Sequence, residues 1–186
     1  MMTMIDLGGG VEPMTAADIK IWARIDRADE DGLIANLIRA ARETIEATTG
    51  LVLARRTFRL ALDPVPSDGW VEVRLSPIVG VTSITAYGAD GTPTVFGASE
   101  AVVERVLGIE AIRLSLAVRM AAANGVEVEF EAGFAVGMVP ENLLLALRTI
   151  VAASYELRAA VDPSQQPAVL PPLARSLLAP YRRVRI

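Results

Sequence analysis

The spacing of apolar residues changes along the chain, from a helical period to a strand period and back again. Between residues 15 and 50, apolar side chains recur every three or four positions, as in an amphipathic helix. Thr15 and Asp18 form a capping-box-like start, and Gly50 is a natural helix stop. We therefore predict two N-terminal helices, and Asp29-Glu30-Asp31 places acidic side chains at the start of the second, where the helix dipole favours them.

From residue 51 the period becomes two, with apolar and polar residues alternating. Turn sequences separate the alternating stretches, and Asp90-Gly91 predicts a hairpin. Residues 97–110 fit a loop, a strand or a short helix. The middle of the chain is therefore predicted to be a small antiparallel β module. Its predicted strands lie at 57–62, 70–75, 81–87, 111–116 and 126–131.

A helical period returns after Pro140, a residue that suits the first turn of a helix. The predicted helix runs to about Ala160 and carries only a narrow polar stripe. Its apolar surface is wide enough to contact its own core on one side and a neighbouring subunit on the other. The candidate subunit-interface residues are Leu143, Leu144, Leu147, Val151 and Tyr155.

A short amphipathic helix is predicted after a proline-rich linker at 162–167, and Pro180 ends it. The tail that follows interleaves arginines with apolar residues. This pattern favours a docking arm that binds an acidic or edge-strand partner, with an unattached basic end or DNA phosphate contact as the alternatives. The arm comprises Leu173, Leu177, Leu178, Tyr181, Arg182, Arg183, Val184, Arg185 and Ile186.

Together these elements predict an α+β fold, in which a small helical bundle carries an inserted antiparallel β module. The bundle has two N-terminal helices, one long helix and one short C-terminal helix. The predicted boundaries are a flexible arm at 1–12 with a glycine hinge, a helical core at 13–50 plus 139–181, a β module at 51–138 and a basic tail at 182–186.

The composition excludes several kinds of chemistry. The 186 residues include no cysteine and no histidine, which removes thiolate nucleophiles, histidine triads and histidine zinc sites. We therefore expect no cofactor, no metal and no enzymatic activity. The formal net charge of −4 argues against non-specific nucleic-acid binding by the whole surface.

The chain is apolar for a protein without a membrane segment. Its mean hydropathy is +0.41, yet it has no uncharged apolar run of about 18 residues and no basic leader. We therefore expect no membrane association, and we expect the surplus apolar surface to be buried between subunits.

Three carboxylates share one face of the last predicted strand, because Glu127, Glu129 and Glu131 alternate with apolar residues. The plainest interpretation is a solvated strand face. The second is the lining of a DNA channel, where acidic groups would repel phosphates and let DNA slide. A carboxylate- or metal-dependent hydrolase is the remaining alternative, and it needs acidic residues from elsewhere in a cleft.

A second basic cluster, formed by Arg55, Arg56 and Arg59, lies where the first predicted strand begins. A solvated strand end explains it. The alternative, a DNA-binding accessory protein, would use these arginines together with the basic tail.

Three parts of the chain, in order, resemble the head–tail connector (adaptor) proteins of long-tailed bacteriophages and gene transfer agents. They are the opening helix pair Met14–Gly50, the middle strand region Arg74–Tyr87 and the two closing segments, Val126–Arg158 and Leu170–Arg183. The resemblance covers roughly residues 14–182 and leaves 92–110 unmatched. No single motif is diagnostic, but the ordered set is specific.

The resemblance implies a homo-oligomeric ring, typically of twelve subunits, beneath the portal of a phage or gene transfer agent particle. Such a ring would extend the DNA channel, let double-stranded DNA pass without sequence-specific contact, and join the capsid to a downstream stopper or tail-completion protein. In similar proteins the C-terminal segment reaches the portal, which implies portal binding for residues 173–186. The implied location is the head–tail junction of a particle assembled in the host bacterial cytoplasm, with no enzymatic activity.

Overall fold

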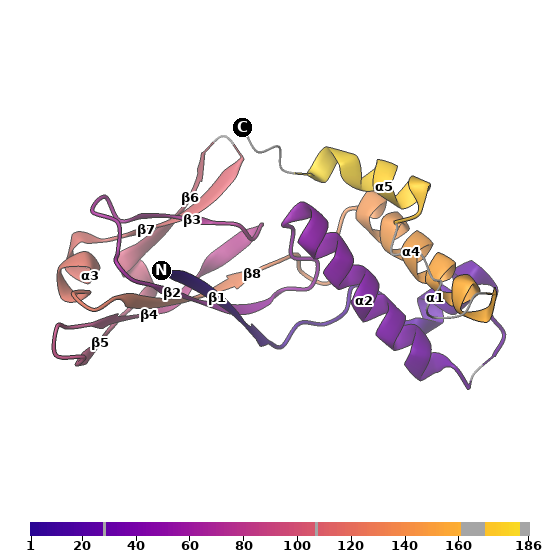
Figure 1. Ribbon diagram of the computed structural model, residues 1–186, viewed down its shortest axis with the longest axis horizontal. Helices are drawn as coiled ribbons and strands as arrows, with labels where there is room; N and C mark the ends of the chain where they lie inside the picture. The colour runs from indigo at the N-terminus through magenta and orange to yellow at the C-terminus, as the bar shows by residue number, and fades with distance from the viewer. Residues whose placement is uncertain (28, 107, 161–169, 183–186) are drawn as a thin grey trace. The chain divides into compact units, whose positions relative to one another are not determined.

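The computed structural model describes residues 1–27, 29–106, 108–160 and 170–182. The chain forms two compact units (Figure 1). The helical unit comprises Val11–Leu53 and Ala135–Ile186, and the β unit comprises Met1–Gly10 and Ala54–Phe134. Four helices lie in the helical unit, and both antiparallel sheets lie in the β unit with one short helix; the predicted α+β fold, a helical bundle with an inserted β module, is confirmed.

The helical unit is built around its longest helix, α4, which contacts the other three helices (Figure 1). Two of them, α2 and α5, also contact each other. The helices are α1 (Ala16–Ala23), α2 (Asp31–Thr49), α4 (Glu141–Ala160) and α5 (Pro172–Leu178), and a 3₁₀ turn, η3 (Ala179–Tyr181), follows α5.

The predicted helix ends of the first pair are confirmed. The Asp18 amide donates to the Thr15 hydroxyl at 3.2 Å, and the Thr15 amide donates to the Asp18 carboxylate at 2.8 Å, which completes a capping box. This hydrogen bonding also holds the pKa of the Asp18 carboxyl below its usual value. Gly50 ends α2 in the left-handed conformation, with φ of 74°.

Branched apolar side chains fill the core of the helical unit. Ile19 of α1, Ile38 of α2 and Leu147 of α4 are buried there. Trp22 of α1, by contrast, is 45% exposed. A helix of just over two turns presents only a narrow stripe to one neighbour.

The β unit contains two antiparallel sheets. The larger has the order β1 (Met2–Gly8), β2 (Arg56–Leu62), β8 (Val126–Ala132), β4 (Ile78–Tyr87) and β5 (Pro93–Phe96). The smaller has the order β3 (Trp70–Val73), β7 (Ile109–Leu114) and β6 (Ala101–Val106). A 3₁₀ turn, η1 (Ala98–Glu100), and a short helix, α3 (Leu116–Ala121), complete the unit.

The predicted flexible N-terminal arm is wrong for most of its length. Residues 2–8 form β1, which pairs antiparallel with β2 from Met2 opposite Leu62 to Gly8 opposite Thr57. The segment has no strict alternation of apolar and polar residues, so its order depends on pairing with a strand some fifty residues later rather than on local pattern.

Other boundaries differ by a few residues. The first predicted strand and the Asp90-Gly91 hairpin form as β2 and as β4–β5, but β3 ends two residues early and β7 begins two residues early. In the ambiguous stretch 97–110, the described residues form η1, β6 and the start of β7. The helix α3, which begins at Leu116 with the Ser115 hydroxyl as its cap, was not predicted.

The inner faces of the two sheets supply the core of the β unit. Phe58 of β2 and Phe130 of β8 stack with ring centroids 5.9 Å apart. Val73 and Ile112 of the smaller sheet are fully buried as well. Among the described residues, no helix is long and apolar enough to cross a membrane.

Candidate functional site

The predicted docking arm is only partly a free surface. Leu178 has no exposed surface, because it packs with Ala174 on the face of α5 that contacts α4. Its assignment to docking is therefore wrong. Leu173 on the opposite side is 54% exposed, Leu177 and Tyr181 are half-buried, and Arg182 is exposed. The last four residues of the predicted arm, 183–186, lie outside the described residues.

Three of the five predicted subunit-interface residues of α4 lie in the core of the helical unit. Leu143, Leu147 and Val151 have no exposed surface, so their assignment to a subunit interface is wrong. The reason is that α1, α2 and α5 all contact α4 and cover more than one of its faces. Leu144 and Tyr155 are half-buried, and the Tyr155 hydroxyl donates to the Glu30 carboxylate.

The three carboxylates predicted to share a face do alternate with buried residues along β8. They lie at the middle of the larger sheet, since β8 is its central strand. Arg59 of β2 donates to Glu129 at 2.7 Å and lies 3.8 Å from Glu127, and the Ser83 hydroxyl donates to Glu129 at 3.1 Å. The acidic face is therefore ion-paired at its centre.

This pairing shifts the pKa of both partners. The hydrogen bond from Arg59, supported by that from Ser83, holds the pKa of the Glu129 carboxyl below its usual value. The same bond raises the pKa of the Arg59 guanidinium further. One cation among three carboxylates leaves a net charge of −2 on this face.

The three arginines around the start of β2 do not form one basic patch. The Arg56 guanidinium binds Asp6 at 2.6 Å and lies 4.9 Å from the centre of the Phe58 ring. Arg59 binds Glu129, and the Arg55 Nε donates to the Gly133 carbonyl at 3.5 Å. A DNA-binding accessory role for this cluster is not favoured, because two of its three charges are neutralised.

The hydrolase alternative would need a cluster of metal-ligating side chains. Within the described ranges, no three acidic side chains converge in a way that would hold a metal ion. Glu129, the best placed carboxylate of β8, already has arginine and serine partners.

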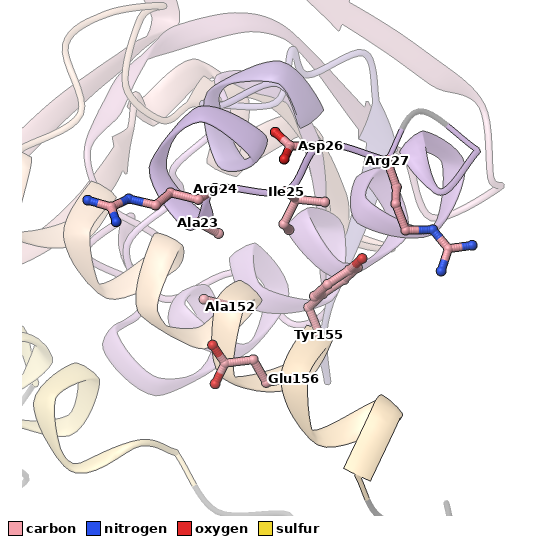
Figure 2. Close-up of a pocket in the computed structure, with 8 residues that line it drawn as sticks. All are labelled: Ala23, Arg24, Ile25, Asp26, Arg27, Ala152, Tyr155 and Glu156. Atoms are coloured by element: carbon pink, nitrogen blue, oxygen red, sulfur yellow. The ribbon is translucent and has the colours of Figure 1, made fainter.

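A surface depression of about 410 Å³ lies where α1 turns into α2, and the sequence did not predict it (Figure 2). Ala23, Arg24, Ile25, Asp26 and Arg27 come from the turn, and the α4 residues Ala152, Tyr155 and Glu156 form the opposite wall. Figure 2 shows Ile25 and Tyr155 facing the hollow, whereas the Arg24 and Arg27 side chains point away on opposite sides. We name this feature the helix-corner depression.

The turn that forms this depression is unusual in its backbone. Arg24 adopts the left-handed conformation with φ of 55°, a conformation that non-glycine residues seldom take. A second depression, of about 520 Å³, adjoins Arg24 on its other side and includes Ile21, which is 82% exposed. Apolar side chains between charged rims suit the capture of an apolar anchor from a protein partner rather than a catalysed reaction.

Comparison with known proteins gives a consistent result. The model of the phage gp6-like head–tail connector family matches residues 13–88. A chain from the neck of an empty gene transfer agent particle, computed with C6 symmetry, is 26% identical with a TM-score of 0.81, and the match covers 99% of this chain and 97% of that one. No curated protein matches.

Two further solved chains share the fold. One comes from the virion of a native gene transfer agent particle, with 24% identity and a TM-score of 0.78, and the other from the neck of a native particle computed with C12 symmetry, with 22% identity and a TM-score of 0.74. Each match covers 99% of this chain and 97% of the other. The resemblance to head–tail connectors inferred from the sequence is confirmed, and it supports a structural adaptor role.

Proposed function

We propose that this chain, a protein similar to phage gp6-like head–tail connectors, is a structural adaptor at the junction of capsid and tail. The particle is a phage or a gene transfer agent assembled in the host bacterial cytoplasm. The observation that carries this proposal is the likeness over 99% of the chain to a neck protein at 26% identity and a TM-score of 0.81.

The proposed assembly is a closed ring, of twelve subunits in our leading hypothesis, beneath the portal. Cyclic symmetry is the usual way for identical chains to close, and two of the similar neck structures were computed with C6 and C12 symmetry. The exposed apolar side chains of the helical unit, among them Ile21, Trp22 and Leu173, supply surface for such contacts.

The proposed DNA channel would be lined by a surface that does not hold DNA. The face of the larger sheet that carries Glu127, Glu129 and Glu131 is a candidate, because its net charge of −2 repels phosphate. DNA would then pass without sequence-specific contact.

The portal contact is proposed for the exposed part of the docking arm. Leu173 and Tyr181 supply apolar surface, and Arg182 begins the basic tail. On the tail side, the partner would be a stopper or tail-completion protein, and the helix-corner depression is a candidate binding site for it.

Two changes test the docking arm without disturbing the core. One removes residues 182–186, and the other is Leu173→Asp; both keep the buried Leu178, whose loss would destabilise the helical unit. We expect each to reduce capture of the chain by purified portal and the count of tailed particles, with an unchanged melting temperature. Met120→Asp, on the exposed side of α3 in the β unit, is the matched control and should bind normally. Normal portal capture by both variants would show that the arm does not dock.

A further inference from the structure

The edge strand β1 exposes a surface that the rest of the β unit avoids. Of its seven residues only Met4 is half-buried, and the others are exposed. Met2, Ile5 and Leu7 are each close to half exposed, and Asp6 is the only charged residue. Among the described strands β1 pairs with β2 alone, so its outer edge is open. Long, apolar, open edges recruit further strands.

The other three sheet edges carry features that block such pairing. The β5 edge is four residues long and starts with Pro93, which has no amide proton. The β6 edge carries the adjacent charges Glu104 and Arg105. The β3 edge is four residues long with Glu72 inside it. The open β1 edge is therefore the exception among four edges.

The register of β1 determines which backbone groups face outward. The Asp63 amide donates to the Met1 carbonyl at 3.0 Å, so these two residues form a hydrogen-bonded pair. In an antiparallel ladder such pairs alternate with non-bonded ones. The backbone amide and carbonyl groups of Thr3 and Ile5 therefore also point toward β2. Met2, Met4 and Asp6 therefore direct their amide and carbonyl groups away from the sheet.

This outward edge is complementary to a second copy of itself. With two β1 strands antiparallel and centred on Met4, each Met4 bonds the other, and each Met2 bonds the Asp6 of the other copy. All the outward groups of both strands are then satisfied, and Ile5 faces Thr3 across the pair. The two Asp6 carboxylates lie at opposite ends, about 14 Å apart at the usual rise per residue. Centring the pair on Asp6 instead would place these charges directly opposite each other.

We propose that β1 is a self-pairing edge, through which two copies of the chain associate in solution by antiparallel β1–β1 pairing. The contact is two-fold and isologous, so it cannot be the repeated contact of a cyclic ring. It is therefore separate from the proposed function and would belong to the chain before ring assembly. The contact is small, so the association is weak and concentration-dependent.

Sedimentation analysis of the full chain over a range of concentrations up to about 0.5 mM tests the proposal, because contacts this small associate weakly. The wild type should show a monomer–dimer equilibrium. Met4→Pro removes an outward amide while leaving every β1–β2 hydrogen bond in place, and proline is tolerated on strand edges. We expect it to weaken the dimer about tenfold or more, because it deletes the central pair of bonds. Met4→Val keeps the amide and should dimerise like the wild type.

A second variant guards against a folding defect in the proline variant. Ile5→Lys places a charge on the exposed face of β1 without touching its backbone and should also weaken the dimer. Circular dichroism and melting temperature should match the wild type in all variants. A wild type that stays monomeric, a dimer that survives both Met4→Pro and Ile5→Lys, or a larger ring whose size neither variant changes would overturn the proposal. Particle assembly is not scored, so failure here leaves the adaptor role intact.

Discussion

Glu110 is a carboxylate in the interior of the β unit, where its side chain is 6% exposed. It accepts hydrogen bonds from the Ser76 hydroxyl at 3.0 Å, the Ile78 amide at 2.8 Å and Arg105 at 3.0 Å. Arg105 also donates to the Ile78 carbonyl at 2.9 Å. One buried group thus connects β7, β6 and the start of β4, because a buried carboxylate must find partners.

Replacing Glu110 by alanine should destabilise the β unit by about 1–3 kcal/mol, because the buried Ile78 amide loses its acceptor. The chain has one tryptophan in each unit, so Trp22→Phe leaves Trp70 of β3 as a fluorescent reporter of the β unit during denaturant unfolding. Glu104→Ala, which breaks an exposed pair with Arg113, is the control and should have a much smaller effect. Equal losses in the two variants would contradict the account of Glu110.

The pairing of Glu129 with Arg59 predicts a pH dependence of stability. The folded pKa of Glu129 is lowered, so its stabilising contribution is present above the unfolded value of about 4.3 and is lost as pH falls through the folded pKa. The free energy of unfolding of wild type and Arg59→Gln should therefore differ most near neutral pH and converge in acid. A gap that widens below about pH 4 would have the wrong sign.

At the scale of single elements, the capping box of α1 is the clearest local determinant of the helical unit. Thr15→Ala removes the hydroxyl that accepts from the Asp18 amide and should lower stability by about 1 kcal/mol. Thr48→Ala is a matched control inside α2. The Thr48 hydroxyl donates a hydrogen bond to the Thr44 carbonyl of the same helix, and alanine has the higher helix propensity. Thermal unfolding should rank the Thr15 variant below the wild type, and the Thr48 variant should be equal to it or above. The reverse order would contradict the assignment.

The helix α5 has a buried side and an exposed side, and one leucine on each side distinguishes them experimentally. Leu178→Ala leaves a cavity between α5 and α4 and should cost about 2–5 kcal/mol. Leu173→Ala removes a side chain that is 54% exposed and should change the melting temperature little. Similar melting temperatures for the two variants would mean that α5 does not pack as described.

Elements with complete local signals were predictable from the sequence. Thr15, Asp18 and Gly50 mark the ends of the first helices, and the strict alternation from Val126 marks β8. The elements that were missed depend on distant residues or are very short. β1 is ordered by its pairing with β2, and α3 has only six residues.

The candidate surfaces were predictable as patterns but not as exposed surfaces. A single amphipathic helix shows which residues are apolar, but which of them face solvent depends on how many neighbours cover it. Leu147 and Leu178 are in the core for this reason, and Glu129 has an arginine partner that only the strand register reveals. The helix-corner depression is formed by a turn and a helix more than a hundred residues apart in the sequence, so no local sequence pattern predicts it.

At the scale of the whole molecule, the chain combines a helical unit and a β unit that each have their own core. The apolar surface left over lies in separate places, among them Ile21 on α1, Leu173 on α5 and the edge strand β1. A protein that makes several different contacts needs several such surfaces, whereas an enzyme needs one cleft. This distribution agrees with the proposed adaptor role.

The most direct test of that role is a reconstruction, without imposed symmetry, of the neck of purified particles by electron cryo-microscopy. We predict a closed ring of this two-unit fold between the portal and the first tail component, with the C-terminal end of each helical unit against the portal. A complete, DNA-filled, tailed particle whose neck contains no copy of this chain would contradict it.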